Sequence, residues 1–252
     1  MSGHSKWATT KHRKAAQDKK RSALFSKLSR NITVAAKEGG DPNPENNASL
    51  AAAVAKAKGY SLPKDKIDAA IKKAFGTGSD SAVFETVVYE GYGAAGVAIY
   101  IEALTDNRNR TAADVRAAFT HQNGNLGTTG SVAFQFERKG QLTLEKAQMP
   151  DEDEFMLAVA EAGADDFEDA DDEWVVFTGP TDLASVRDAL VAQGLEIKGY
   201  ELIMEPTTPT DVNISQARQV IKLVDKLEEL EDLQNVYHSM DITDEIAAAL
   251  DE

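Results

Sequence analysis

Hydrophobic positions recur every three or four residues through the first third of the chain, which is the spacing of one helix face. The pattern runs over residues 22–37, 47–59 and 63–74, and Gly39-Gly40 supplies a stop after the first run. Polar residues fill the positions between. The sequence therefore predicts a three-helix domain over residues 22–75.

The pattern changes after a Gly- and Ser-rich break at residues 76–79, the best candidate for a linker in the chain. Short β-rich runs at 86–89 and 97–101 predict two strands joined by a glycine-rich turn. A helix follows, for which Thr111 and Asp114 have the spacing of a capping box. These elements predict a small α/β domain.

Val132, Phe134 and Phe136 alternate with small or polar residues, which predicts a half-buried strand. From Gln141 a new series begins with the order strand, helix, strand, strand, helix, strand. Its members are centred on 142–144, 155–159, 167, 174–177, 183–190 and 197–204. That order is the ferredoxin-like βαββαβ arrangement.

A last apolar stripe at helical spacing runs from Ile214 to Leu230 and needs a surface to cover. We expect this C-terminal helix to return to the small sheet of residues 84–136, which makes the ferredoxin-like unit an insertion. The fold class predicted is α+β and multidomain. The domains are 1–78, a basic tail with the helical domain; 79–136 plus 205–252, the small α/β domain; and 137–204, the inserted ferredoxin-like domain.

Charge separates the two ends of the chain. Residues 1–30 contain nine Lys or Arg and one Asp, a net charge of +8, and residues 1–75 reach +10. The whole chain carries −15, so residues 76–252 carry −25. A basic segment on an acidic body attracts a polyanion at one end and repels it elsewhere, which favours nucleic acid as the partner. A merely solvated basic tail is the alternative.

Trp7, His4 and His12 lie among these cations, and an exposed indole can stack on an unpaired base while Lys and Arg hold phosphates. The candidate nucleic-acid-binding residues are Lys6, Trp7, Lys11, His12, Arg13, Lys14, Lys19, Lys20, Arg21, Lys27 and Arg30. Trp7 can equally be a hydrophobic anchor on the helical domain.

Composition excludes several other classes. The chain has no cysteine, so disulfides, thiolate metal sites and a cysteine nucleophile are ruled out. No apolar run approaches the roughly 20 residues that span a bilayer, and neither a signal peptide nor a transit peptide pattern is present. We expect a cytoplasmic protein with no membrane partner.

Catalytic and cofactor motifs find no support. Gly91-x-Gly93-x-x-Gly96 resembles a dinucleotide fingerprint, but a β-rich run follows it where a helix is required, so a hairpin turn is favoured. The glycine-rich stretch 124–131 has no lysine to reach a phosphate, and a helix end leading into a turn is favoured there. The four histidines lack metal-site spacing, and the acidic run 165–173 is interpreted as a solvated edge. We expect no enzyme activity, metal, cofactor or small-molecule substrate.

Asn107-Arg108-Asn109-Arg110 is the remaining polar cluster, placed by the pattern in a loop before a helix. The forked guanidinium groups of Arg108 and Arg110 match phosphate geometry, which makes them possible secondary phosphate contacts. They can equally pair with acids of the acidic body.

Several motifs together resemble the YebC/PmpR family, whose mitochondrial relatives include the translational activator of cytochrome oxidase. They are GHSKW (3–7), KHRKA (11–15), LFSKL (24–28), YEGYG (89–93), LTDNRNRT (104–111), GNLG (124–127) and QNVY (234–237). The resemblance spans nearly the whole chain and implies the three-domain architecture described above. One departure is Ala94-Ala95, which stands where the family usually has Pro-Gly, so this turn must accommodate a Cβ.

The resemblance implies a non-enzymatic regulator of gene expression that binds DNA. Other members are similar to translation factors that associate with the ribosome and relieve stalls at proline-rich sequences, so ribosomal RNA and the ribosome are the alternative partners. The sequence shows no helix-turn-helix with base-reading side chains on one face, whereas a basic tail suits RNA or backbone contact. A protein-binding module acting through the acidic body is the second alternative.

Overall fold

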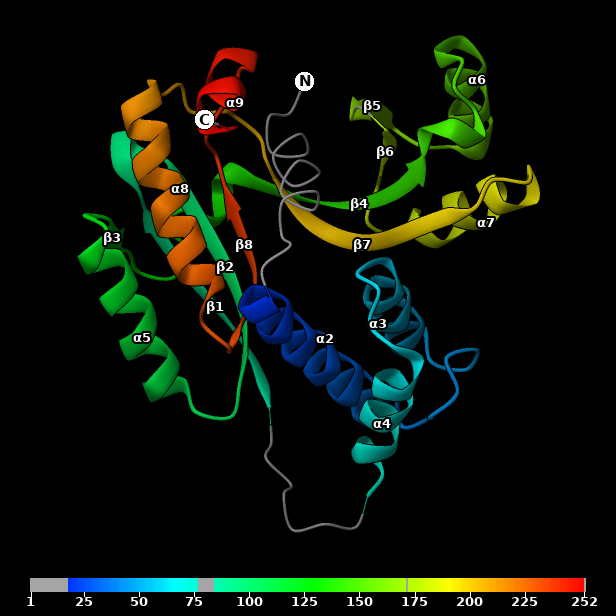
Figure 1. The fold of residues 1–252 in the computed structure, drawn as a ribbon, viewed down its shortest axis with the longest axis horizontal. Coiled ribbons are helices and arrows are strands. Elements are labelled where there is room, and N and C mark those ends of the chain that lie inside the picture. The colour runs from blue at the N-terminus through cyan, green and yellow to red at the C-terminus, as the bar shows by residue number, and fades with distance from the viewer. Residues whose placement is uncertain (1–17, 77–83, 171, 252) are drawn as a thin grey trace. The chain divides into compact units, whose positions relative to one another are not determined.

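The computed structural model describes residues 18–76, 84–170 and 172–251. These residues form an α+β fold with two four-stranded antiparallel sheets, which confirms the predicted fold class (Figure 1). They group into two compact units. The first unit is built mainly from residues 84–137 and 204–251, and the second from 24–76, 138–170 and 172–203. The division into three domains with the predicted boundaries stays a prediction.

Three helices form the N-terminal part of the described chain, as predicted. They are α2 (Asp18–Gly39), α3 (Ala48–Gly59) and α4 (Lys64–Ala74). The side chain of Asn47 accepts a hydrogen bond from the Leu50 N–H at 3.0 Å, which caps α3. Leu28, Ile32 and Leu50 are among the buried residues of the shared core. Most of the predicted linker lies outside the described residues.

The first unit contains the sheet β3-β1-β2-β8 and three helices. Its elements in chain order are β1 (Glu85–Tyr92), η1 (Ala94–Gly96), β2 (Ala98–Thr105), α5 (Arg108–His121), β3 (Asn125–Leu126), η2 (Ala133–Gln135), α8 (Ile214–Glu228), β8 (Leu233–His238) and α9 (Asp244–Asp251). The predicted return of α8 onto this sheet is confirmed, because Val220, Leu223 and Val224 join Ile99 and Ile101 in one core. The expectation that α8 is the last element was wrong, because β8 and α9 follow it.

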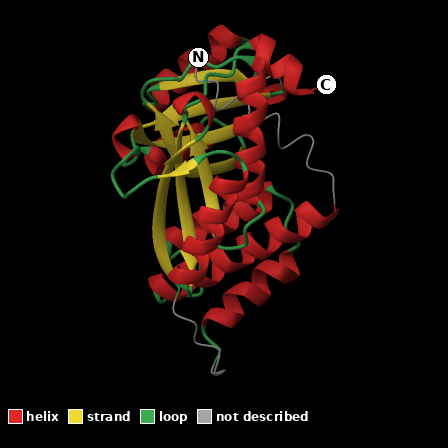
Figure 2. Ribbon diagram, turned by 90° about the vertical axis from the view of Figure 1, so that its left-hand side faces the viewer, coloured by secondary structure: helices red, strands yellow, loops and turns green. Residues whose placement is uncertain are grey.

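The second unit also contains the sheet β5-β6-β4-β7. Its elements are β4 (Phe136–Glu145), η3 (Lys146–Gln148), α6 (Glu152–Ala162), β5 (Asp166–Ala170), β6 (Glu173–Thr178), α7 (Leu183–Ala192) and β7 (Ile197–Pro206). The main elements follow the βαββαβ order, which confirms the ferredoxin-like prediction. Figure 2 shows the helices and strands of the described residues in a second view. Trp174 and Phe155 stack at the centre of this core with ring centroids 4.7 Å apart.

The predicted strand through Val132, Phe134 and Phe136 was wrong in its first half. Residues Ala133–Gln135 form the 3-10 helix η2, and the strand β4 begins only at Phe136 and continues without a break to Glu145. Val132 and Phe136 are buried, whereas Phe134 is 74 % exposed. A 3-10 helix repeats every three residues, whereas side chains of a strand return to the same face every two. Phe134 therefore no longer shares a face with Val132 and Phe136.

The acidic run lies on and beside β5, which is at the edge of its sheet. Phe167 packs inward against Phe155 and Trp174, whereas Asp166 and Asp169 are exposed. Charged side chains on an edge strand disfavour pairing with another chain. This arrangement agrees with the interpretation of the run as a solvated edge.

The predicted hairpin between β1 and β2 is confirmed, with Tyr92 opposite Ala98 next to the turn. Ala95 has φ +57°, in the left-handed region that favours glycine. Ala95→Gly should therefore raise the free energy of unfolding by about 0.5–1 kcal/mol, because the relieved strain exceeds the added flexibility of the unfolded chain. Denaturant titration measures this. The control Ala94→Gly removes no such strain and should lower stability, so equal effects of both changes would contradict the explanation.

Candidate nucleic-acid interface

The basic segment falls largely outside the described part of the chain. That holds for Lys6, Trp7, Lys11, His12, Arg13 and Lys14. Lys19, Lys20 and Arg21 belong to the first turns of α2, and Arg30 is half-buried further along the same helix. Lys27 is only 9 % exposed, which makes it less available to a phosphate than an open surface lysine. Nucleic-acid binding by this set stays a prediction.

The prediction that the NRNR cluster (107–110) lies in a loop was wrong. The cluster forms the N-cap and the first turn of α5. Asn107 is the N-cap, with φ −148° and ψ 91°, and its side chain accepts a hydrogen bond from the Arg110 N–H at 3.1 Å. The Thr105 hydroxyl accepts a hydrogen bond from the Asn107 N–H at 2.9 Å and so fixes the cap directly after β2. The predicted capping box at Thr111 was therefore wrong, because the helix begins one turn earlier and Thr111 is buried inside it.

Asp232 organises the residues around this helix start, and the sequence reasoning did not find it. Its side chain is only 9 % exposed. Oδ2 lies 2.7 Å from the Thr111 hydroxyl, 3.3 Å from the Thr105 hydroxyl and 2.8 Å from Nη2 of Arg110. The backbone carbonyl of Asp232 also accepts a hydrogen bond from the Leu104 N–H at 2.8 Å. Asp232, the residue directly before β8, thus joins the end of β2 to the start of α5.

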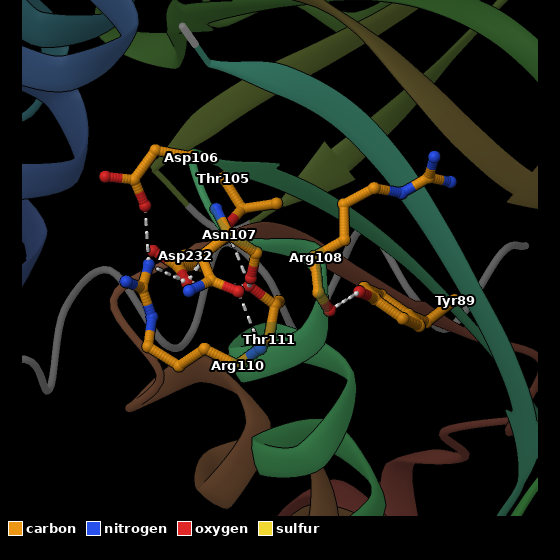
Figure 3. A network of polar contacts seen from close by, with 8 residues as sticks. All are labelled: Tyr89, Thr105, Asp106, Asn107, Arg108, Arg110, Thr111 and Asp232. Atoms are coloured by element: carbon orange, nitrogen blue, oxygen red, sulfur yellow. Dashed lines mark hydrogen bonds and ion pairs between the residues drawn. The ribbon is translucent and has the colours of Figure 1, made fainter. Parts of the chain in front are cut away.

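Arg110 is shared between two carboxylates, Asp232 and Asp106, each 2.8 Å from Nη2 (Figure 3). The hydrogen bond to Asp232 is the largest cause that raises the pKa of Arg110 above its ordinary value, and the hydrogen bond to Asp106 is the next largest. Its guanidinium keeps its charge and uses it within the protein. The sequence left two roles open for Arg110, a phosphate contact and pairing with acids. In this structure Arg110 pairs with acids.

Arg108 points away from the Asp232 network, which we define as Asp232, Arg110, Asp106, Thr105 and Thr111 (Figure 3). Its side chain is 64 % exposed, and Glu85 lies 3.7 Å from its Nη1. The backbone carbonyl of Arg108 accepts a hydrogen bond from the Tyr89 hydroxyl at 3.3 Å. An exposed pair at this distance holds a guanidinium weakly. A phosphate contact by Arg108 stays a prediction.

The glycine-rich stretch 124–131 is a helix end leading into a turn, as predicted. The Gly124 N–H donates to the Phe119 carbonyl at 2.8 Å, and β3 then pairs with β1. Beyond β3, three backbone N–H groups converge on Glu90, which is only 3 % exposed. Gly130 donates to Oε1 at 2.7 Å, and Val132 and Ala133 donate to Oε2 at 2.7 and 2.8 Å.

The N–H groups of this loop are thus used by an internal anion, the Glu90 carboxylate. Burial by itself raises the pKa of Glu90, but the hydrogen bonds from Gly130, Val132 and Ala133 together outweigh it, and the pKa is lowered from its ordinary value. The carboxylate is therefore ionised at neutral pH. Its role is to hold the loop 127–133 in place.

The described residues contain no group of three or more His, Asp or Glu that could hold a metal ion. Within the same part of the chain, no helix is both long and apolar enough to cross a membrane. The Asp232 network and the Glu90 contacts each connect segments that are far apart in the chain.

Comparison with known proteins identifies the family to which this architecture belongs. A helical N-terminal part followed by two antiparallel sheets with their helices defines a mixed α+β class. The family description "TACO1/YebC protein N-terminal domain" matches residues 5–77, and "TACO1/YebC second and third domain" matches residues 84–240. The chain belongs to the TACO1/YebC family.

The relatives carry regulatory names. A "Probable transcriptional regulatory protein" of Bifidobacterium longum is 48 % identical over 252 residues, which is all of both chains. A protein of the same name from Rubrobacter xylanophilus is 49 % identical over 98 % of both chains. The crystal structure of a conserved hypothetical protein from Aquifex aeolicus has a TM-score of 0.81 at 38 % identity and covers 90 % of this chain and 93 % of that one. The Bifidobacterium and Rubrobacter relatives are thus named as regulators.

Proposed function

We propose that this protein is a non-enzymatic, nucleic-acid-binding regulator of gene expression, and that its basic N-terminal segment supplies most of the affinity. The observation that carries the proposal is the charge distribution, +8 within residues 1–30 against −25 within residues 76–252. Such a distribution attracts phosphates at one end of the chain only. The regulatory names of the relatives support the same class.

Ribosomal RNA is the second candidate ligand, and the composition of two helices, α3 and α4, favours it over sequence-specific DNA. Neither α3 nor α4 contains an Arg, Asn or Gln, the side chains that most often read base edges in the major groove. Their cations are lysines, which contact phosphates as point charges. A contact of this kind suits a nucleic acid recognised by its backbone or its shape.

The test replaces Lys11, Arg13, Lys14, Lys19, Lys20 and Arg21 by Ser in the full chain. We expect affinity for nucleic acid to fall at least about tenfold and the slope of log affinity against log salt to flatten by several units, because each phosphate contact contributes about 0.9. Binding to duplex DNA and sedimentation with ribosomes, both over a salt series, measure these quantities and distinguish the two ligands.

Arg116 and Lys222 are exposed cations on the acidic part of the chain and provide the control. Replacing both by Ser should leave the salt slope unchanged. If the six-residue variant binds as the unmodified protein does, the basic segment is only solvated and the proposal is wrong. Retention of ribosome binding with no binding to duplex DNA would select the translational role.

A further inference from the structure

Phe134 is an exposed aromatic residue in the first unit. Its side chain is 74 % exposed, although phenylalanine is among the residue types most often buried in folded proteins. Among the described residues of the first unit it is the one large apolar side chain in the exposed class; Phe75, Met156, Leu157, Val191 and Leu202, the others in that class, belong to the second unit. Protein-binding hot spots are typically clusters of apolar side chains, and no second large apolar side chain of the exposed class accompanies Phe134 among the described residues of the first unit.

The backbone that carries Phe134 is held on both sides. The Glu90 carboxylate binds the N–H groups of Val132 and Ala133 directly before it. The Gln135 carbonyl directly after it accepts a hydrogen bond from the Thr207 N–H at 2.8 Å. The ring is therefore presented from a fixed backbone, so that binding a partner requires little further ordering of the chain.

The stretch that leads up to Phe134 in the sequence carries no charge. Residues 122–136 contain no Lys, Arg, Asp, Glu or His, within a part of the chain whose net charge is −25. Asn125, Thr128 and Thr129 are exposed there and offer neutral hydrogen-bonding groups. A polyanion approaching this stretch meets no carboxylate from it, and amide and hydroxyl groups suit base edges and sugar hydroxyls.

We propose that Phe134 is a stacking platform for an unpaired base of single-stranded RNA, with the neutral residues 122–136 around it as a second contact besides the basic segment. This inference rests on the proposed nucleic-acid-binding function and adds the kind of ligand, a base that is not paired. Stacking on an aromatic ring is indifferent to base identity, since every base has a π-face.

The test measures the affinity of the full chain for a fluorescently labelled single-stranded RNA and for the same RNA annealed into a duplex. Phe134→Ala should weaken binding to the single strand about 5- to 100-fold and leave duplex binding unchanged. The salt slope should not change, because the phenyl ring neutralises no phosphate. Phe134→Trp should bind the single strand at least as tightly as the unmodified protein.

Two further variants separate stacking from plain apolar contact. Phe134→Leu keeps an apolar side chain without a π-face and should lose nearly as much affinity as Phe134→Ala. Leu157→Ala removes a side chain that is 66 % exposed on α6 and should change nothing. Melting temperatures should stay unchanged for all of these variants, since each replaced side chain is exposed.

Each outcome bears on one of the two proposals. If the single strand binds and Phe134→Ala leaves its affinity unchanged, the stacking platform is wrong and the function proposed for the basic segment stands. If Phe134→Leu binds as the unmodified protein does while Phe134→Ala does not, the contact is apolar and not stacking, and a protein partner is the better explanation. If the unmodified protein binds neither RNA nor DNA, both proposals are wrong.

Discussion

Glu90→Gln is expected to lower the free energy of unfolding by about 3 kcal/mol, because hydrogen bonds to a charged acceptor contribute about 1.5–3 kcal/mol each. The three N–H groups that converge on Glu90 all need an acceptor. A glutamine amide offers one oxygen and turns an NH₂ group toward the remaining donors. At least one of the three N–H groups then loses its partner. Urea titration at pH 7 measures the loss.

Glu137→Gln is the matched control, since Glu137 is exposed near the start of β4. It should change stability by less than about 0.5 kcal/mol. An equally large loss in this control would contradict the role assigned to Glu90, as would an unchanged stability of Glu90→Gln.

The effect of Glu90→Gln on stability should depend on pH, with a sign that follows from the lowered pKa of Glu90. A group whose pKa is lowered by folding stabilises the fold fully above its unfolded pKa, and this contribution is lost as the pH falls through the folded pKa. The stability difference between the unmodified protein and Glu90→Gln should therefore be constant near neutral pH and shrink below about pH 4.5, the ordinary value for the group. A difference that grows on acidification would contradict this explanation.

The parts of the fold that sequence patterns predicted are those determined by local signals. α8 has a complete apolar stripe and a capping box between Asn213 and Gln216, so its position could be read from the sequence. β6 is a continuous apolar run from Trp174 to Phe177, typical of a buried strand. The ferredoxin-like order followed from such elements in succession.

The parts that were missed depend on contacts between residues far apart in the chain. β8 contains Gln234 and Asn235 and has no clear alternation, and it is a strand because it pairs with β2. η2 interrupts an alternating sequence because Glu90, more than 40 residues earlier, binds the N–H groups of Val132 and Ala133. No window of local sequence contains both partners of such an interaction.

The candidate site also has one part that local sequence reveals and one that depends on contacts between distant residues. The basic segment is a property of composition, and counting charges is sufficient to find it. The Asp232 network is not, because Asp232 and Thr105 are 127 positions apart and nothing near Asp232 distinguishes it from the other acids of the chain. Asn107 and Thr111 both have cap-forming side chains, and the contact of Asn107 with the end of β2 decides between them.

Asp232→Asn should lower the free energy of unfolding by about 2 kcal/mol. The substitution keeps the volume of the side chain but removes the charge that Arg110 faces, and it turns donors toward groups that need an acceptor. The estimate lies below the 3–5 kcal/mol typical of a broken buried ion pair because the Arg110 side chain is 48 % exposed. Urea titration of both proteins at pH 7 measures the difference.

Asp106→Asn is the matched control, because Asp106 contacts the same nitrogen of Arg110 at the same 2.8 Å but is 37 % exposed, against 9 % for Asp232. It should lower stability by no more than about 0.5 kcal/mol, as for other exposed pairs one helical turn apart. Combining Asp232→Asn with Arg110→Gln completes a double-mutant cycle, in which the two losses should not be additive because the two side chains are in direct contact. Equal losses for Asp106→Asn and Asp232→Asn would show that burial does not distinguish these carboxylates, and Asp232 would then not be the residue that joins β2, α5 and β8.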